Sequence, residues 1–324
     1  MKEFRVTADQ EGQALFKFAA KILEKAPAGL LHKWLRKKTI DVNRKKCTGK
    51  EILRAGDEVH MWLSDDTFQA FAVPLRQKEE SREARCLAEC ILYEDRDWIA
   101  VDKPAGLLSQ KDREGGESLN DWLLAYTGTE AGLRPSICSR LDRNTSGLLL
   151  CGKTMGALQT AARLLKSRRI HKYYRAWVLG KLPRSGRLEG YMKKDASRNQ
   201  VRVRAEGGDG WLDMETVYHA VQEREVEGAV ITECELLLVT GRTHQLRAHL
   251  SSIGHPILGD RKYGTKASMV LSEKLRIRRH LLHAARMEFP EDPALGGLSG
   301  GILTAPRPFD FQKLDLEKTG GGAR

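Results

Sequence analysis

The chain has 324 residues, of which 41% are hydrophobic, so it can bury a large core, which at this length we expect to be shared by more than one domain. A formal net charge of +12 favours a polyanionic partner, because basic surfaces gain affinity by displacing counterions from phosphate backbones. The chain offers no apolar window long enough to span a membrane and no apolar targeting segment near Met1, which excludes an integral membrane protein and favours the cytoplasm.

The cysteines follow no paired spacing and contain no Cys-x-x-Cys motif. Reduced thiols are therefore expected instead of a disulfide framework. Cys86 and Cys90 could share a helix face, but no histidine lies nearby to complete a tetrahedral site, so no metal is expected there.

The first 63 residues are predicted to form a small basic module. They carry fourteen Lys or Arg and eight Asp or Glu, which gives half of the net charge of the whole chain. Apolar spacing predicts a helix over 13–25 and a second, very basic helix over 30–38. Alternating residues predict strands at 39–43 and 53–62.

This module resembles the S-four-type, or alpha-L, RNA-binding domain, which presents a basic helix pair to structured RNA. The resemblance makes four residues of the second helix candidates for phosphate contacts, namely Lys33, Arg36, Lys37 and Lys38. A solvated helix face is the structural alternative. Arg44 stands where the domain commonly has glycine, so the geometry of that turn is open.

Residues 64–89 are polar and charged, which predicts a linker between modules. Strand-like runs at 91–93 and 98–101 begin a larger region, which we place at 90–312, and a flexible tail is expected over 313–324. Lys103 begins a turn at 103–106, and we favour a structural role for it over a catalytic one.

The most informative segment is the predicted loop at 139–147. It places Asp142 between Arg140 and Arg143, directly before a turn and an apolar run at 148–151 that reads as a buried strand. Flanking guanidiniums favour the charged carboxylate, which suits a nucleophile or a general base. An Arg-Asp ion pair that braces a loop is the structural alternative.

Further elements follow in chain order. Thr154 is expected to cap a helix that reaches Leu165, and alternation at 173–178 predicts a strand with one face turned inward. A strand at 233–239 is followed by a helix from His244, for which Thr243 is the predicted cap. His244 and His249 lie five residues apart and do not share a helix face, so they make a poor metal pair and are expected to bond backbone or phosphate.

Four ordered blocks resemble the RluA-type family of ribosomal pseudouridine synthases. The loop reads Ser-Arg-Leu-Asp-Arg-Asn-Thr-Ser-Gly at 139–147, with a Val-Asp-Lys-Pro-Ala-Gly-Leu block at 101–107 before it. Lys-Tyr-Tyr-Arg-Ala at 172–176 and Thr-Gly-Arg-Thr-His-Gln-Leu-Arg-Ala-His-Leu at 240–250 follow it. The likeness extends over about residues 88 to 311.

The resemblance implies an α+β pseudouridine synthase fold, with a mixed, mostly antiparallel central sheet flanked by helices. It also implies isomerisation of uridine to pseudouridine in structured RNA, with large-subunit ribosomal RNA as the expected substrate and transfer RNA as an alternative. No metal, organic cofactor or nucleotide is implied, and a monomer is expected.

The same resemblance assigns roles to five residues. Asp142 acts on the sugar, either by attacking C1′ or by removing the C2′ proton. Tyr174 stacks on the flipped uracil, and Arg247 orients Asp142. Arg140 fills the gap left in the RNA stack or binds a flanking phosphate, while Leu246 belongs to the apolar wall of the cleft.

Two departures and two rival interpretations remain. Ser139 replaces the usual histidine and Asn144 a frequent aspartate, so contacts to the flanking nucleotides are open. The segment 147–154 matches the phosphate-binding loop of nucleotide hydrolases, but its apolar run favours a buried strand over exposed amides. A non-enzymatic RNA-binding factor would need only the basic module.

Overall fold

The computed structural model describes the chain except for residues 73–80, 113, 129–133, 196–199 and 317–324. Its N-terminal part is built on a four-stranded antiparallel sheet in the order β1-β4-β2-β3. The strands are β1 (Lys2–Arg5), β2 (Ile40–Val42), β3 (Lys45–Lys46) and β4 (Glu58–Met61). A 3-10 turn (Ala8–Gln10), α1 (Leu15–Ile22) and α2 (Ala28–Arg36) complete it.

Apolar side chains of both helices form the core of this unit against the sheet. Leu15 and Phe18 of α1, Leu35 of α2 and Val59 and Met61 of β4 are all fully buried. The predicted helices therefore form, although the first is shorter than expected and the second begins and ends two residues earlier. Strand β1 precedes them without having been predicted.

The segment 64–89 is more structured than the predicted linker. Ser64 caps α3 (Asp65–Phe71), because its hydroxyl accepts from the Thr67 amide. Phe68 and Phe71 of this helix pack against the N-terminal core, so α3 belongs to that unit. Ser81 caps α4 (Arg82–Cys90), which packs on the larger region through Leu87. The middle of the predicted linker, 73–80, lies outside the described residues.

The larger region is organised around an eleven-stranded mixed sheet. Its main path runs β11-β10-β12-β13-β9-β14-β8-β6-β5, with β7 paired to β8 and β15 paired to β14. These pairs are antiparallel except β8 with β14, which is parallel. The expected mixed and mostly antiparallel sheet is therefore confirmed.

The strands of this sheet have the following bounds: β5 (Ile91–Glu94), β6 (Trp98–Lys103), β7 (Ser136–Ile137), β8 (Ser146–Gly152), β9 (His171–Leu179), β10 (Ser185–Asp195), β11 (Gln200–Arg204), β12 (Leu212–Val226), β13 (Ala229–Leu238), β14 (Leu282–Glu288) and β15 (Ile302–Thr304). The helices are α5 (Leu119–Thr127), α6 (Met155–Lys166), α7 (Gln245–Ser252), α8 (Lys266–Lys274) and α9 (Phe309–Leu316), with a 3-10 segment at Pro293–Leu298.

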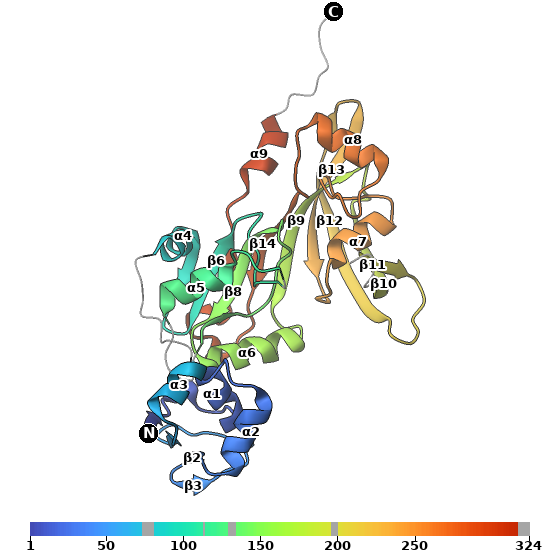
Figure 1. The fold of residues 1–324 in the computed structure, drawn as a ribbon. Coiled ribbons are helices and arrows are strands. Elements are labelled where there is room, and N and C mark those ends of the chain that lie inside the picture. The colour runs from blue at the N-terminus through green and yellow to red at the C-terminus, as the bar shows by residue number, and fades with distance from the viewer. Residues whose placement is uncertain (73–80, 113, 129–133, 196–199, 317–324) are drawn as a thin grey trace, which may run out of the picture.

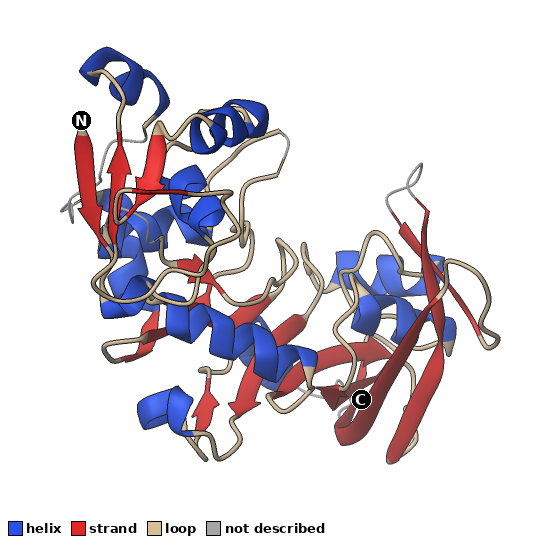
Figure 2. Cartoon of the chain, turned by 90° about the horizontal axis from the view of Figure 1, so that it is seen from below, coloured by secondary structure: helices blue, strands red, loops and turns tan. Residues whose placement is uncertain are grey.

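The helices flank different parts of this sheet. Helices α4 and α5 lie beside β6, whereas α7 and α8 lie beside the long strands β12 and β13 (Figure 1). Helix α6 lies next to the N-terminal unit, to which Gln159 donates a hydrogen bond at the Gly12 carbonyl over 3.3 Å. Seen from below, the N-terminal unit and the long strands occupy opposite ends of the molecule (Figure 2).

Strand β8 forms because its apolar run is buried on both faces. Leu148, Leu149 and Cys151 are fully buried, and Gly147 approaches β14 so closely that a Cβ would clash with the Ala284 carbonyl. Gly147 also has a φ of 104°, which glycine adopts without strain. Since this run is a core strand, it cannot present the exposed amides of a phosphate-binding loop.

The C-terminal tail begins later than predicted. Residues 313–316 belong to α9, where Phe311 and Leu314 are buried in a cluster with Trp177. Phe311 and Leu314 are three positions apart, so on a helix they face the same core, and this spacing was overlooked in the predicted tail. The rest of the predicted tail, 317–324, is outside the described residues. Among the described helices, none has the length and apolarity needed to cross a membrane.

Candidate active site

A cleft of about 530 Å³ opens over the middle of the large sheet. Four segments that are distant in the sequence line it: the turn after β6, the loop between β7 and β8, the start of β9, and the turn that leads into α7. Asp142, Tyr174 and Arg247 all line this cleft, and so do Arg140 and Leu246. The five residues that were expected around the base therefore share one cavity.

Asp142 lies on a loop that is braced by its neighbours. Its carbonyl accepts a hydrogen bond from the Thr145 amide at 3.0 Å, which closes the turn before β8. Next to it, the Arg143 carbonyl accepts from Lys103 Nζ at 3.2 Å. The Asp142 side chain remains 26% exposed toward the cleft, so a substrate can reach it.

Lys103 has the contacts of a structural lysine. It is fully buried, and its Nζ donates to the carbonyls of Pro104 (2.9 Å), Leu107 (2.8 Å) and Arg143 (3.2 Å). Burial lowers the pKa of Lys103 to about 7, against the opposing effect of the Asp142 charge. These bonds join the turn after β6 to the loop of Asp142.

A guanidinium from α7 holds the carboxylate of Asp142. Arg247 Nη1 donates to Asp142 Oδ2 at 2.8 Å, across 105 residues of sequence. On its other side, Arg247 Nε and Nη2 donate to the two oxygens of Asp260 at 2.7 and 2.8 Å. The bidentate pair with Asp260 fixes the plane of the guanidinium, and that plane aims Nη1 at Asp142.

The electrostatics of the Arg247–Asp260 pair keep both of its members charged. Burial lowers the pKa of Arg247, but the bonds and charges of Asp260 and Asp142 outweigh burial and raise it. Burial raises the pKa of Asp260, but the hydrogen bonds from Arg247 and from the Lys262 amide outweigh burial, so the pKa of Asp260 is lowered. Asp260 is 1% exposed, so its charge depends on Arg247.

The arginines adjacent to Asp142 do not serve it as expected. Arg140 is exposed and forms no ion pair within the described part of the chain, and Arg143 Nε donates to the Gly106 carbonyl at 3.1 Å. Neither arginine is paired with the Asp142 carboxylate, which bonds to Arg247 instead. The positive charge at Asp142 comes from α7 instead.

Tyr174 lies on the inner face of β9, which the alternation of the strand did not by itself identify. Its ring is buried in the main core next to Leu246 and Leu141, and it also lines the cleft. Burial, with the Asp142 charge, raises the pKa of Tyr174, so its phenol is a neutral donor. The adjacent Tyr173 packs elsewhere, with its ring 3.7 Å from the Arg286 guanidinium carbon.

The basic residues of α2 lie outside this cleft. The candidates for phosphate contacts, Lys33, Arg36, Lys37 and Lys38, are all exposed in the N-terminal unit. None of them forms an ion pair with another described residue. Their charges are therefore available to an external partner.

Two residues of the site were missed or misplaced by the sequence analysis. Asp260 received no role, although a buried acid after Gly259 was a signal for it. Helix α7 begins at Gln245, and His244 is its N-cap in a left-handed conformation, so Thr243 is not the cap and His244 is not helical. The imidazole of His244 lines the cleft, with Nε2 3.9 Å from Asp142 Oδ1.

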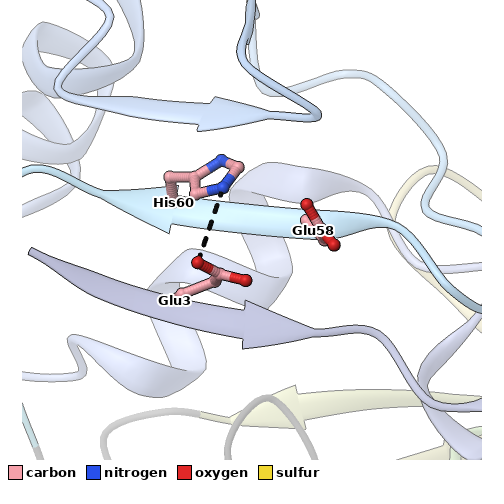
Figure 3. A group of neighbouring side chains, drawn as sticks. All are labelled: Glu3, Glu58 and His60. Atoms are coloured by element: carbon pink, nitrogen blue, oxygen red, sulfur yellow. Dashed lines mark ion pairs between the residues drawn. The ribbon is translucent and has the colours of Figure 1, made fainter.

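One group of described residues has the proximity of metal ligands, and it lies far from this cleft in the sequence. Glu3, Glu58 and His60 come from β1 and β4 of the N-terminal unit (Figure 3). His60 Nδ1 bonds to Asp41 at 3.0 Å, and its Nε2 lies 3.9 Å from Glu3. The contacts of the imidazole with Asp41 and Glu3 account for this arrangement, so we assign no metal to it.

Comparison with known proteins points to one family. Residues 97–252 match the family described as RNA pseudouridylate synthase. The chain is 30% identical to the ribosomal large subunit pseudouridine synthase D of Nitrosomonas europaea, over 96% of this chain and 86% of that protein. It is 32% identical to the ribosomal large subunit pseudouridine synthase C of Escherichia coli, over 96% and 93% of the two chains.

Solved structures support the same fold. The human protein named RNA pseudouridylate synthase domain containing 4 superposes with a TM-score of 0.58 at 24% identity, over 73% of this chain and 97% of that one. Its relative named domain containing 1 gives a TM-score of 0.52 at 24% identity, over 72% and 96%. Both matches cover nearly all of the human chains, and about a quarter of this chain lies outside them.

Proposed function

Since the chain belongs to the RNA pseudouridylate synthase family and is an enzyme that isomerises uridine to pseudouridine, we propose that it acts on uridines of large-subunit ribosomal RNA with Asp142 as the catalytic carboxylate. Its curated relatives are named as large-subunit ribosomal pseudouridine synthases, and the aligned regions cover nearly all of this chain and most of each relative. These names support the choice of ribosomal RNA.

The Asp142–Arg247–Asp260 triad carries the proposal. It places a carboxylate on the wall of a cleft, held through Arg247 by a second, buried carboxylate. An acid that is exposed to substrate yet fixed in direction suits attack at a defined atom. A purely structural ion pair would not need to open into a cavity of this size.

The chemistry requires a base that has left the RNA stack. In the proposed reaction the flipped uridine enters the cleft, and Tyr174 stacks on its uracil. Asp142 then either attacks C1′ or removes the proton of C2′, while the C1′–N1 bond breaks and its electron pair moves to the base. The base rotates and rejoins C1′ through C5, as the bond from C1′ to Asp142 breaks or C2′ regains its proton from Asp142. C5 then loses its proton and N1 gains one. The sum is an isomerisation, so no oxidant, reductant or hydrolysis is involved.

The remaining residues serve binding in this proposal. Arg140, exposed at the rim of the cleft, occupies the space left by the flipped base or contacts a flanking phosphate. Leu246 contributes to the apolar wall beside Tyr174. The N-terminal unit acts as an alpha-L RNA-binding module, which we extend from residue 63 to residue 72 because α3 packs on its core.

Mapping of pseudouridines tests this function directly. Large-subunit ribosomal RNA from a strain that lacks the protein should be missing pseudouridine at one or a few positions, and addition of the purified enzyme should restore them. Missing pseudouridines in transfer RNA alone would overturn the assignment of ribosomal RNA. An intact pseudouridine map in all RNA would overturn the proposed function.

A further inference from the structure

His244 presents a hydrogen-bond donor to the cleft that no described residue accepts. Its side chain is 14% exposed and lines the cavity beside Asp142. The 3.9 Å between Nε2 and Asp142 Oδ1 is too long for a hydrogen bond, and no other partner of Nε2 lies within bonding distance in the described structure.

The hydrogen bonds of Tyr263 determine which nitrogen of His244 carries the proton. The Val201 amide donates to the Tyr263 hydroxyl at 3.0 Å, so that oxygen acts as an acceptor toward β11. The hydroxyl proton then points to its other neighbour, His244 Nδ1, at 2.9 Å. Because Nδ1 accepts, the neutral imidazole bears its proton on Nε2, which faces the cleft.

The imidazole is also neutral in this environment. Burial lowers the pKa of His244 from 6.5, and the charge of Arg247 adds to this, while Asp142 opposes it. Lys262 also lowers the pKa, and Asp260 raises it slightly. The pKa of Tyr263 is raised by burial, so its phenol keeps the proton that it donates.

The backbone of His244 turns the chain into α7. Its φ of 56° and ψ of 18° lie in the left-handed region, which glycine and asparagine adopt more easily than histidine. The His244 carbonyl accepts a hydrogen bond from the Ala248 amide at 3.0 Å, whereas its side chain makes no cap bond to the helix. The imidazole is therefore left to line the cleft.

We propose that His244 donates its Nε2–H to O2 of the flipped uracil and stabilises the base as it leaves C1′. This inference rests on the proposed function. Asp142 Oδ1 must face C1′ or C2′ in either route, and a donor 3.9 Å from Oδ1 faces the atoms bonded near C1′. Of these atoms, uracil O2 gains negative charge when the C1′–N1 bond breaks.

His244 keeps its own proton in this step. The electron pair of the C1′–N1 bond goes to N1 and is delocalised onto O2, where the fixed N–H of His244 meets it. C1′ is satisfied by a bond to Asp142 or by loss of the C2′ proton to Asp142. The donor is released when C5 of the base bonds to C1′ and C5 loses its proton.

A matched pair of variants separates this role from a structural one. His244→Asn suits the left-handed backbone but is too short to reach O2, so we expect about a 100-fold loss of kcat with KM nearly unchanged and a melting temperature at or above that of the wild type. His244→Gln carries an amide N–H at a similar reach and should restore most of kcat. Equal kcat for the Asn variant and the wild type would overturn the inference, as would a loss of kcat in the Asn variant that Gln does not rescue.

The accepting atom is tested with a modified substrate. Sulfur accepts hydrogen bonds poorly, so RNA with 2-thiouridine at the target should slow the wild type but not slow His244→Asn further. If the kcat of His244→Asn on the 2-thiouridine substrate is still about 100-fold below that of the wild type on the same substrate, the assignment of O2 is wrong. Wild-type turnover of the unmodified RNA in the same assay shows that a negative result concerns His244 and not the proposed function.

Discussion

Asp260 holds Arg247 through both oxygens of its carboxylate, at 2.7 and 2.8 Å, and thereby leaves one nitrogen of the guanidinium for Asp142. The two acids differ in burial, since Asp260 is 1% exposed and the Asp142 side chain 26%. The buried acid therefore orients the arginine, and the exposed acid is free to meet a substrate. Because the two acids have different roles, each can be tested by its own variant.

Asp142→Asn should abolish pseudouridine formation without loss of RNA affinity. The amide has the shape of the carboxylate and can still accept from Arg247, but it can neither attack C1′ nor remove the C2′ proton. Product is measured by mapping of pseudouridine in the target RNA, and affinity by titration of the same RNA. Turnover near the wild-type level would contradict the assigned role.

Asp260→Asn should reduce both stability and kcat. The change leaves the Arg247 charge buried with one carboxylate fewer, which costs about 3 kcal/mol or more of the free energy of unfolding. A freely rotating guanidinium also holds Asp142 less well, so kcat falls more than KM changes. The matched control is Asp213→Asn, since Asp213 forms exposed ion pairs with Arg168 and Arg242 and should contribute less than about 1 kcal/mol. Equal effects of the two variants would mean that Asp260 has no special role.

Stability should fall as the pH drops below 6.5. Burial lowers the pKa of His249, His280 and His283 to about 4 in the folded protein. Between pH 6.5 and 4 the unfolded chain therefore binds more protons, so the stabilisation is complete above 6.5 and is lost as the pH falls. Melting temperatures from pH 8 to 4.5 measure the trend. His280→Gln should make the melting temperature depend less on pH. The same change at the exposed His219 should leave the pH dependence unchanged.

Removal of four basic side chains from the N-terminal unit should weaken RNA binding and its salt dependence. Each lost phosphate contact lowers the slope of log K against log salt by about 0.7 to 0.9. The variant replaces by alanine the residues Lys33, Arg36, Lys37 and Lys38. A control with equal charge loss replaces four exposed residues of α8 and the turn after it, namely Lys266, Lys274, Arg276 and Arg278.

The two variants should differ in affinity but not in chemistry. At saturating concentrations of a minimal RNA substrate, kcat should match the wild type in both, because neither set of residues lies in the cleft. A slope equal to that of the control variant would show that α2 is a solvated face and makes no phosphate contacts.

The sequence by itself determined the local features of this protein. The buried run of β8 and the Thr154 cap of α6 depend on neighbouring residues, and the structure confirms both. The blocks around Asp142 also indicated the family. These features could be predicted because strand and helix periodicity and capping operate over a few residues.

Only the tertiary structure decided how the carboxylate is held. Arg140 and Arg143 are close to Asp142 in the sequence but form no ion pair with it, while Arg247 reaches it from 105 residues further on. The hold of Asp260 on Arg247 and the chain from Val201 through Tyr263 to His244 likewise join separate elements. Side-chain direction at a loop depends on what packs around it, and those contacts exist only once the sheet and α7 have come together.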